Sequence, residues 1–156
     1  MTRSGPDLAL LLLASFRTLV DAATEELAAR GYDDVRPSHD FAMRAIASGA
    51  DSASDLGRAM SVSKQAASKT IAVLIDRGYV TRVEDPRDAR RRPLQVTALG
   101  WEVMHEGERI FTELRDRWEQ RVGHDEFRAF VAVLEELVGD ATVRLDAPGW
   151  VAHELG

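Results

Sequence analysis

Apolar residues recur at spacings of three and four along most of this chain, which is the period of an amphipathic α-helix. The first such segment predicts a helix from Asp7 to Arg30 that ends at Gly31. Its apolar stripe is wider than one small domain needs to bury, which indicates a neighbouring partner. The stripe contains Leu8, Leu12, Phe16, Leu19, Ala23 and Leu27, and it is widened by Leu11, Leu13 and Val20.

Three shorter helices are predicted next, and serine residues mark their beginnings. Ser38 is the expected N-cap of the first of them, and a turn at residues 61–63 separates the other two. The expected bounds are Pro37 to Gly49, Ser52 or Ser54 to Met60, and Lys64 to Arg77 followed by Gly78, a residue typical of helix ends.

A β-hairpin is predicted after these helices, with strands at Tyr79–Glu84 and Leu94–Thr97 and a loop from Asp85 to Pro93. Because proline has no N–H to donate, Pro93 predicts a short hairpin that pairs weakly at its tip.

Two further helices are predicted after the hairpin. Thr97 is expected to cap a long one, Gly123-His124-Asp125 breaks it, and the last helix ends near Gly139. It carries Phe127, Phe130, Val131, Leu134 and Leu137. The predicted fold is therefore mainly α with a small β-hairpin wing. The predicted parts are an N-terminal helix in residues 1–36, a winged helix-turn-helix in 37–100, C-terminal helices in 101–146, and a tail in 147–156. We expect the tail to be loose, with Trp150 as its one candidate to dock on the rest of the protein.

Composition fits one globular domain with helical extensions, since the 156 residues are 45% apolar. The chain has no cysteine, which excludes disulfides and thiolate metal sites. The apolar run Leu8–Phe16 has the composition of a secretion signal, but Asp7 and Arg17 flank it and it is too short to span a bilayer. A buried or subunit-contacting helix in a cytoplasmic protein, with no membrane partner, is the expectation.

Charge is distributed unevenly along the chain. The net charge is −6, yet residues 58–92 carry nine basic and four acidic side chains, and both lysines of the protein lie there. A local excess of +5 within an acidic protein draws phosphates to one face. The charge pattern therefore favours a nucleic-acid partner.

The fourth predicted helix has an apolar stripe on one side and short polar side chains on the other, in its first turns. Such residues contact base edges when a helix enters the major groove of DNA. The alternative is an ordinary solvated helix face, and the turn before this helix and the hairpin after it favour DNA. The candidate residues are Lys64, Gln65, Ser68 and Lys69.

The predicted hairpin loop concentrates arginine, whose planar guanidinium suits the minor groove and the phosphate backbone. Its candidates for DNA contact are Arg87, Arg90, Arg91 and Arg92. Asp88 would be repelled by phosphate, so we expect it to support the wing by pairing with an arginine such as Arg90. A charged loop in solvent is the alternative interpretation.

The segment from Ser61 to Gly100 resembles the recognition helix and wing of the MarR family of transcriptional regulators. The family's wing pattern is met in order by Asp85-Pro86, Asp88-Ala89-Arg90, Val96-Thr97 and Gly100. The second half of the predicted recognition helix departs from the family's pattern at Ala72, Val73 and Ile75. The family usually has polar or charged residues at these positions. Either these three pack on a neighbouring element, or the helix makes fewer phosphate contacts.

The resemblance implies a homodimer, formed by the N- and C-terminal helices, that binds a near-palindromic operator on double-stranded DNA. It also implies a repressor released by a small aromatic or anionic effector, although control without a ligand stays open. By position, the effector cleft would be lined by Phe16, His39, Met43, Trp101 and His105. The alternative is that these five are core or interface residues.

Other chemistries find little support. The sequence has no zinc-protease, nucleophile-elbow or phosphate-loop motif, so no enzyme activity and no cofactor are expected. The acidic residues beside His105 and His124 are adjacent to them rather than spaced to converge, so no metal site is expected. The remaining alternative is a winged-helix protein-interaction module without DNA binding.

Overall fold

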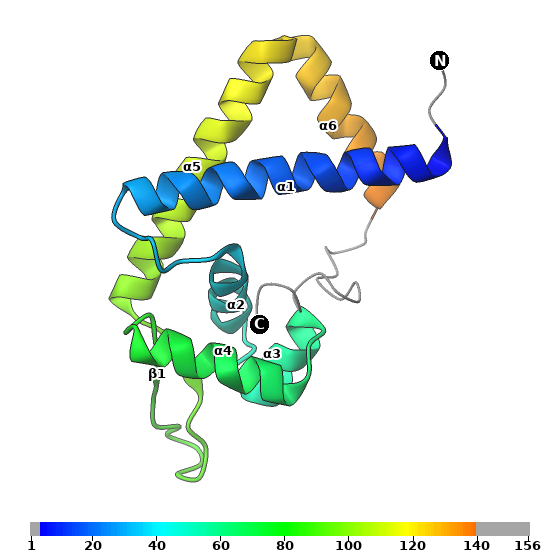
Figure 1. Cartoon of the computed structure of the whole chain (residues 1–156). Coiled ribbons are helices and arrows are strands. Elements are labelled where there is room, and N and C mark those ends of the chain that lie inside the picture. Colours follow the sequence, from blue (N-terminus) through cyan, green and yellow to red (C-terminus); the bar gives the residue numbers. More distant parts are fainter. Residues whose placement is uncertain (1–3, 140–156) are drawn as a thin grey trace. The chain divides into compact units, whose positions relative to one another are not determined.

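The computed structural model describes residues 4–139 and is mainly helical, with one antiparallel hairpin, as predicted (Figure 1). The elements are α1 (Gly5–Ala29), α2 (Pro37–Ala47), α3 (Ala53–Met60), α4 (Lys64–Asp76), β1 (Val80–Arg82), β2 (Leu94–Val96), α5 (Ala98–Val122) and α6 (His124–Val138). Among the described residues, 4–35 and 106–134 form a first compact unit, and 36–105 with 135–139 form a second. The expectations for Trp150 and for the tail lie outside the described residues.

The first unit contains α1, most of α5 and most of α6. Helix α1 starts at Gly5, two residues before the predicted start, because Ser4 and Asp7 cap each other's backbone N–H groups. Its buried residues lie in the second half of the helix. The core of this unit consists of Val20, Ala23, Leu27, Val35, Ile110, Leu114 and Phe127.

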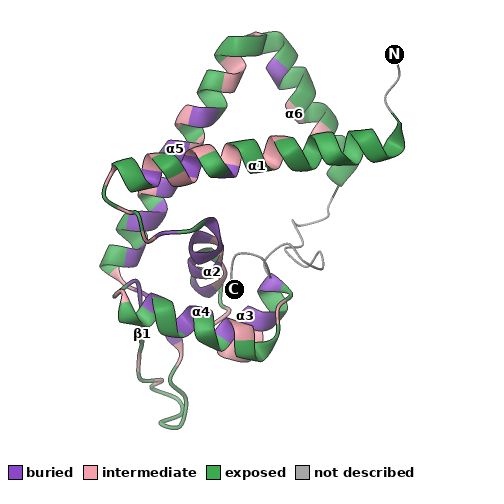
Figure 2. Cartoon of the chain, in the orientation of Figure 1, coloured by how far each residue is buried: buried purple, intermediate pink, exposed green. Residues whose placement is uncertain are grey.

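The first half of α1 leaves its leucines in solvent (Figure 2). Leu10 is 64% exposed, and Leu137 near the end of α6 is 78% exposed. The same holds for Leu8, Leu11, Leu12, Leu13, Phe130, Val133 and Val138, each more than two fifths exposed. The apolar surface is therefore in excess of what the described chain buries. Across residues 4–139, no helix combines the length and the hydropathy that crossing a membrane requires.

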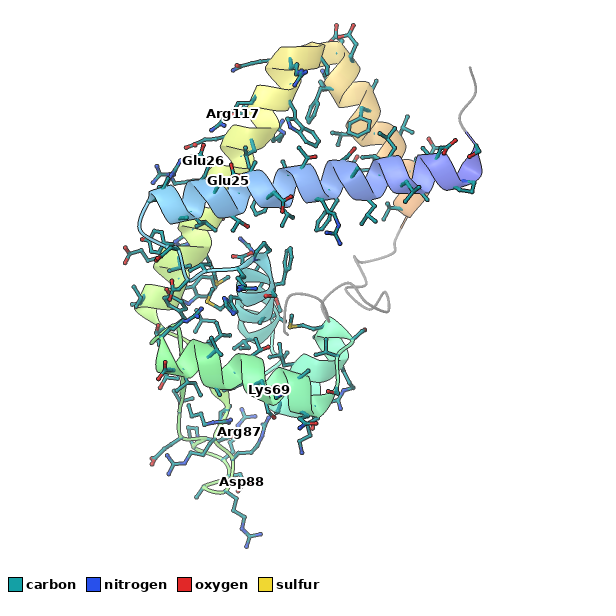
Figure 3. All side chains as sticks on the ribbon, in the orientation of Figure 1. Glu25, Glu26, Lys69, Arg87, Asp88 and Arg117 are labelled. Atoms are coloured by element: carbon teal, nitrogen blue, oxygen red, sulfur yellow. The ribbon has the colours of Figure 1, made fainter. Side chains whose placement is uncertain are left out.

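Ion pairs join the end of α1 to α5 within the first unit. Arg30 donates to Glu106 and, at 2.8 Å, to Glu113, while Arg117 donates to Glu26 at 3.0 Å (Figure 3). The hydrogen bond from Arg30 holds the pKa of Glu106 below its usual range, and the bond from Arg117 does the same for Glu26. Both carboxylates therefore stabilise this unit only while they are ionised.

The second unit packs α2, α3 and α4 around a shared core with the hairpin and the start of α5. Serine caps two of these helices: Ser52 accepts from the N–H of Asp55, and Ser63 accepts from that of Ala66. The prediction that Ser38 caps α2 is wrong. The helix begins at Pro37, and its N-cap is Arg36, two residues before Ser38, which lies inside the helix. Proline suits the first helical position because it lacks an N–H that would need a cap.

The hairpin strands are three residues each, shorter than predicted, with Val80 opposite Val96 and Arg82 opposite Leu94. The missing donor of Pro93 explains part of this, because Pro93 offers only its carbonyl, which accepts from the N–H of Val83 at 3.0 Å. The returning strand is held from its other side as well. The N–H of Leu94 donates to the carbonyl of Asp51, in the link between α2 and α3, at 2.9 Å.

The first turn of α5 lies directly against the start of β1. Thr97 caps α5 as predicted, because its hydroxyl accepts from the N–H of Gly100 at 3.1 Å. A methyl group at Gly100 would lie 2.2 Å from the carbonyl oxygen of Tyr79 and 2.7 Å from Val96. The Tyr79 carbonyl cannot move away, because it accepts a hydrogen bond from the N–H of Thr97. Position 100 therefore requires glycine.

We expect Gly100→Ala to lower the free energy of unfolding by about 1–3 kcal/mol, the usual range for overpacking. Urea denaturation followed by circular dichroism measures it. Gly5→Ala is the matched control, because nothing lies within 4 Å of a methyl group there. In that variant stability should stay the same or rise by up to about 1 kcal/mol, since alanine favours the helix. Equal stability of the two variants would contradict the close approach.

We expect acid to weaken the first unit through Glu106 and Glu26. Their lowered pKa values mean that their stabilisation is complete above about pH 4.3, the ordinary glutamate pKa, and is lost as the pH falls through the lowered values. Glu106→Gln should melt at a lower temperature than the wild type near pH 7. The difference in melting temperature between Glu106→Gln and the wild type should become smaller toward about pH 3. Glu108→Gln, which removes an exposed carboxylate without an ion pair in the described chain, should keep the wild-type profile.

Candidate nucleic-acid interface

Helix α4 separates a buried stripe from a polar face. Ala67, Thr70, Ile71 and Leu74 are buried, and the helix packs on α3 and α2. The four side chains predicted to meet base edges, Lys64, Gln65, Ser68 and Lys69, are all exposed. Lys69 is labelled in Figure 3. Neither lysine forms an ion pair with another described residue. The polar face is therefore open over the first two turns, where a helix in the major groove meets the bases.

The second half of the exposed face is apolar. Val73 is 36% and Ile75 38% exposed, and Ala72 is exposed as well. Of the two explanations that the sequence left open, packing on a neighbouring element finds no partner in the described part of the chain. The remaining explanation is that this half of α4 offers few phosphate contacts.

Two aspartates shape the loop between β1 and β2 from inside. Asp85 accepts from the backbone N–H of Arg87 at 2.9 Å, and Asp88 accepts from that of Arg90 at 2.9 Å (Figure 3). Each is a short Asx-type turn, which fixes the backbone two residues on. Asp88 thus accepts from the backbone of Arg90, and within residues 4–139 no ion pair joins it to the guanidinium of Arg90, where the pairing is expected from the sequence.

The four loop arginines differ in what their guanidinium groups contact. Arg91 is paired with Asp51 at 2.8 Å and with Asp85 at 3.5 Å, and Arg92 lies 3.7 Å from Glu84. Arg87 and Arg90 are exposed, and neither forms an ion pair within residues 4–139. These two are the loop cations that are open to phosphate.

The residues predicted to line an effector cleft lie in different environments. Met43 is completely buried and His39 nearly so, with its Nδ1 accepting from the N–H of Arg36 at 3.1 Å. Trp101 and His105 are exposed, and their rings lie 6.0 Å apart. Phe16 belongs to the first unit. The effector cleft stays a prediction, with His39 and Met43 contributing to the core of the second unit.

Sequence reasoning missed Asp51. It lies in a loop, forty residues from the arginine that it binds, and no local pattern marks it. Asp51 lies outside the basic segment of residues 58–92, so the charge pattern did not suggest a role for it. Metal chemistry gains no support either: within the described chain, no three His, Asp or Glu residues come together as a metal site.

The arrangement of α3, turn, α4, hairpin and α5 defines a winged helix-turn-helix protein. Residues 41–91 match the model of the MarR family, a range that contains the larger part of α2, both helices of the motif, β1 and most of the loop. No curated protein matches the chain by sequence.

Solved structures share this fold at low sequence identity. The reduced form of MarR from Escherichia coli is 19% identical with a TM-score of 0.72, over 85% of this chain and 96% of that one. A MepR mutant from Staphylococcus aureus bound to an oligodeoxyribonucleotide is 16% identical with a TM-score of 0.61, over 84% and 95%. CouR from Rhodococcus jostii bound to p-coumaroyl-CoA is 16% identical with a TM-score of 0.62, over 88% and 95%.

The match to the MarR family is confined to residues 41–91, and the solved structures that share the whole fold include MarR from Escherichia coli. The MepR structure holds DNA and the CouR structure holds an acyl-CoA, so members of this fold bind both kinds of molecule.

Proposed function

We propose that this protein is a repressor that binds a near-palindromic operator as a homodimer. The observation that carries the proposal is that one compact unit presents both the open polar face of α4 and the two unpaired arginines of the loop. That unit contains the segment with a charge excess of +5 in an acidic protein. A duplex-DNA target implies action in the cytoplasm.

The proposed contacts follow from side-chain chemistry. Gln65 suits an adenine edge, Lys64 and Lys69 suit guanine or phosphate, and Ser68 suits either. The loop enters the adjacent minor groove with Arg87 and Arg90. Arg92 adds positive charge from its exposed, weakly paired position.

Dimer formation is supported by the exposed leucines of α1 and the exposed apolar residues of α6. A patch of this extent on helices is what a subunit interface covers. Two recognition helices about 34 Å apart would then read two half-sites.

Release by a small aromatic or anionic effector is the family-based part of the proposal. The CouR structure with p-coumaroyl-CoA supports it as an example within the fold. A protein-interaction module without DNA binding is the alternative. The apolar half of α4 favours this alternative, and DNA selection separates the two.

We expect the wild-type protein to enrich a palindromic sequence from a random duplex pool. Arg90→Ala should weaken binding to that sequence by about 1–3 kcal/mol and reduce the salt dependence of the affinity, because arginine–phosphate contact releases counterions. Fluorescence anisotropy over a salt titration measures both quantities. Arg128→Ala, an exposed arginine of α6, is the control and should match the wild type. No enrichment from the pool would favour the interaction module.

We expect a dimer by multi-angle light scattering at micromolar concentration. A Leu8→Glu, Leu12→Glu double variant should shift the protein toward monomer, because each glutamate would place a charge in the apolar interface. Leu99→Glu is the matched control: Leu99 is 43% exposed, like Leu12 at 44%, but lies in the second unit at the start of α5. A strictly monomeric wild type would refute the dimer.

A further inference from the structure

Asp51 and Arg91 join the loop of the hairpin to the link between α2 and α3. Nη2 of Arg91 donates to both carboxylate oxygens of Asp51, at 2.8 and 3.1 Å. Nη1 of the same guanidinium lies 3.5 Å from Oδ2 of Asp85. One arginine thus bridges two acidic side chains from segments that are far apart in the sequence.

The backbone repeats this connection. The carbonyl of Asp51 accepts from the N–H of Leu94 at 2.9 Å, so side chain and main chain of one residue both hold the returning side of the loop. The next residue, Ser52, is the N-cap of α3. The contact therefore links the loop to the helix-turn-helix core itself.

The bridge continues into the turns that carry the open arginines. Asp85, held by Arg91, accepts from the N–H of Arg87, and the N–H of Arg91 donates to the carbonyl of Asp88 at 3.0 Å. Asp88 in turn accepts from the N–H of Arg90. A chain of contacts thus leads from Asp51 to the backbone of both Arg87 and Arg90.

We propose that Asp51 is a positioning residue for DNA binding: through Arg91 it holds the hairpin loop so that Arg87 and Arg90 meet the DNA. The proposal rests on the proposed function and sharpens it, because it assigns Arg91 an intramolecular role in place of the DNA contact expected from sequence. A loop held in its bound conformation loses less conformational freedom on binding, which raises affinity.

The direction in which Asp51→Asn changes the DNA affinity tests this proposal, because electrostatics and loop positioning predict opposite changes. Removing a carboxylate near a DNA-binding face reduces repulsion of phosphate, so on electrostatics alone Asp51→Asn should bind DNA more tightly. If Asp51 positions the loop, the same substitution weakens binding. The two effects predict opposite directions for one measurement.

The experiment uses the full chain and the duplex that the wild type selects from a random pool, with anisotropy over a salt titration. Asp51→Asn and Arg91→Gln should each lower affinity about three- to tenfold. The double variant should lose no more than either single one, because both remove the same contact. Asp51→Glu, which keeps the carboxylate, should recover part of the affinity.

Asp76→Asn is the matched control. It makes the same chemical change at an exposed aspartate of α4 that has no side-chain partner within residues 4–139, so affinity should stay equal or rise. Melting temperatures of all variants should stay close to that of the wild type, which separates positioning from unfolding. A steeper loss for Arg91→Gln than for Asp51→Asn, together with a smaller salt slope, would overturn the proposal and make Arg91 a phosphate contact.

Hydrogen exchange without DNA separates failure of this proposal from failure of the proposed function. Asp51→Asn should speed exchange at the N–H groups of Leu94 and Arg90, whereas Asp76→Asn should leave them unchanged. If the wild type selects no DNA but the exchange differs as expected, the contact exists and the DNA function fails. If exchange and affinity are both unchanged in Asp51→Asn, the positioning role is refuted.

Discussion

The arrangement of the second unit depends on one junction, where the end of α4, the start of β1, the end of β2 and the start of α5 meet. The Thr97 hydroxyl donates to the carbonyl of Gly78 at 2.6 Å and accepts from the N–H of Gly100. The Thr97 N–H donates to the carbonyl of Tyr79 at 3.0 Å. These three hydrogen bonds of Thr97 thereby fix where α4 stops, where the hairpin closes and where α5 begins. The left-handed φ of Gly78, +77°, allows the chain to turn there.

The two units are stabilised differently. The first relies on a modest core and a network of ion pairs around Arg30, with a long stretch of α1 left uncovered. The second buries a compact core of methionine, leucine and valine and exposes basic side chains on the outer face of α4 and on the loop. This division fits a protein in which one part assembles subunits and the other meets a charged partner.

Local patterns were sufficient to predict most of this fold. The stripe of α4, the cap at Thr97 and the glycine after α4 involve residues within a few positions of each other, so the sequence displays them directly. The misplaced cap at Ser38 shows the limit of such patterns, because serine and proline both mark a helix start and only the backbone tells which position comes first.

Long-range contacts were beyond this kind of prediction. The pairing of Asp51 with Arg91 depends on how the α2–α3 link meets the loop. From the sequence alone, all four loop arginines were equal candidates for DNA contact. Burial of His39 and Met43 likewise depends on what packs over α2. The exposure of the four polar side chains of α4 was easier to predict, because it follows from the position of the apolar stripe on the same helix.

The unpaired state of Arg87 and Arg90 has a kinetic consequence. An arginine held in an intramolecular ion pair must break that pair before it can bind phosphate, which adds a step to each encounter. These two break none, so the loop can engage the backbone of DNA on first contact. Oriented, unpaired cations also steer a diffusing polyanion from a distance, an effect that fades as salt rises. On the proposed function, the loop would thereby favour fast association, and the lifetime of the complex would depend on the contacts proposed for α4.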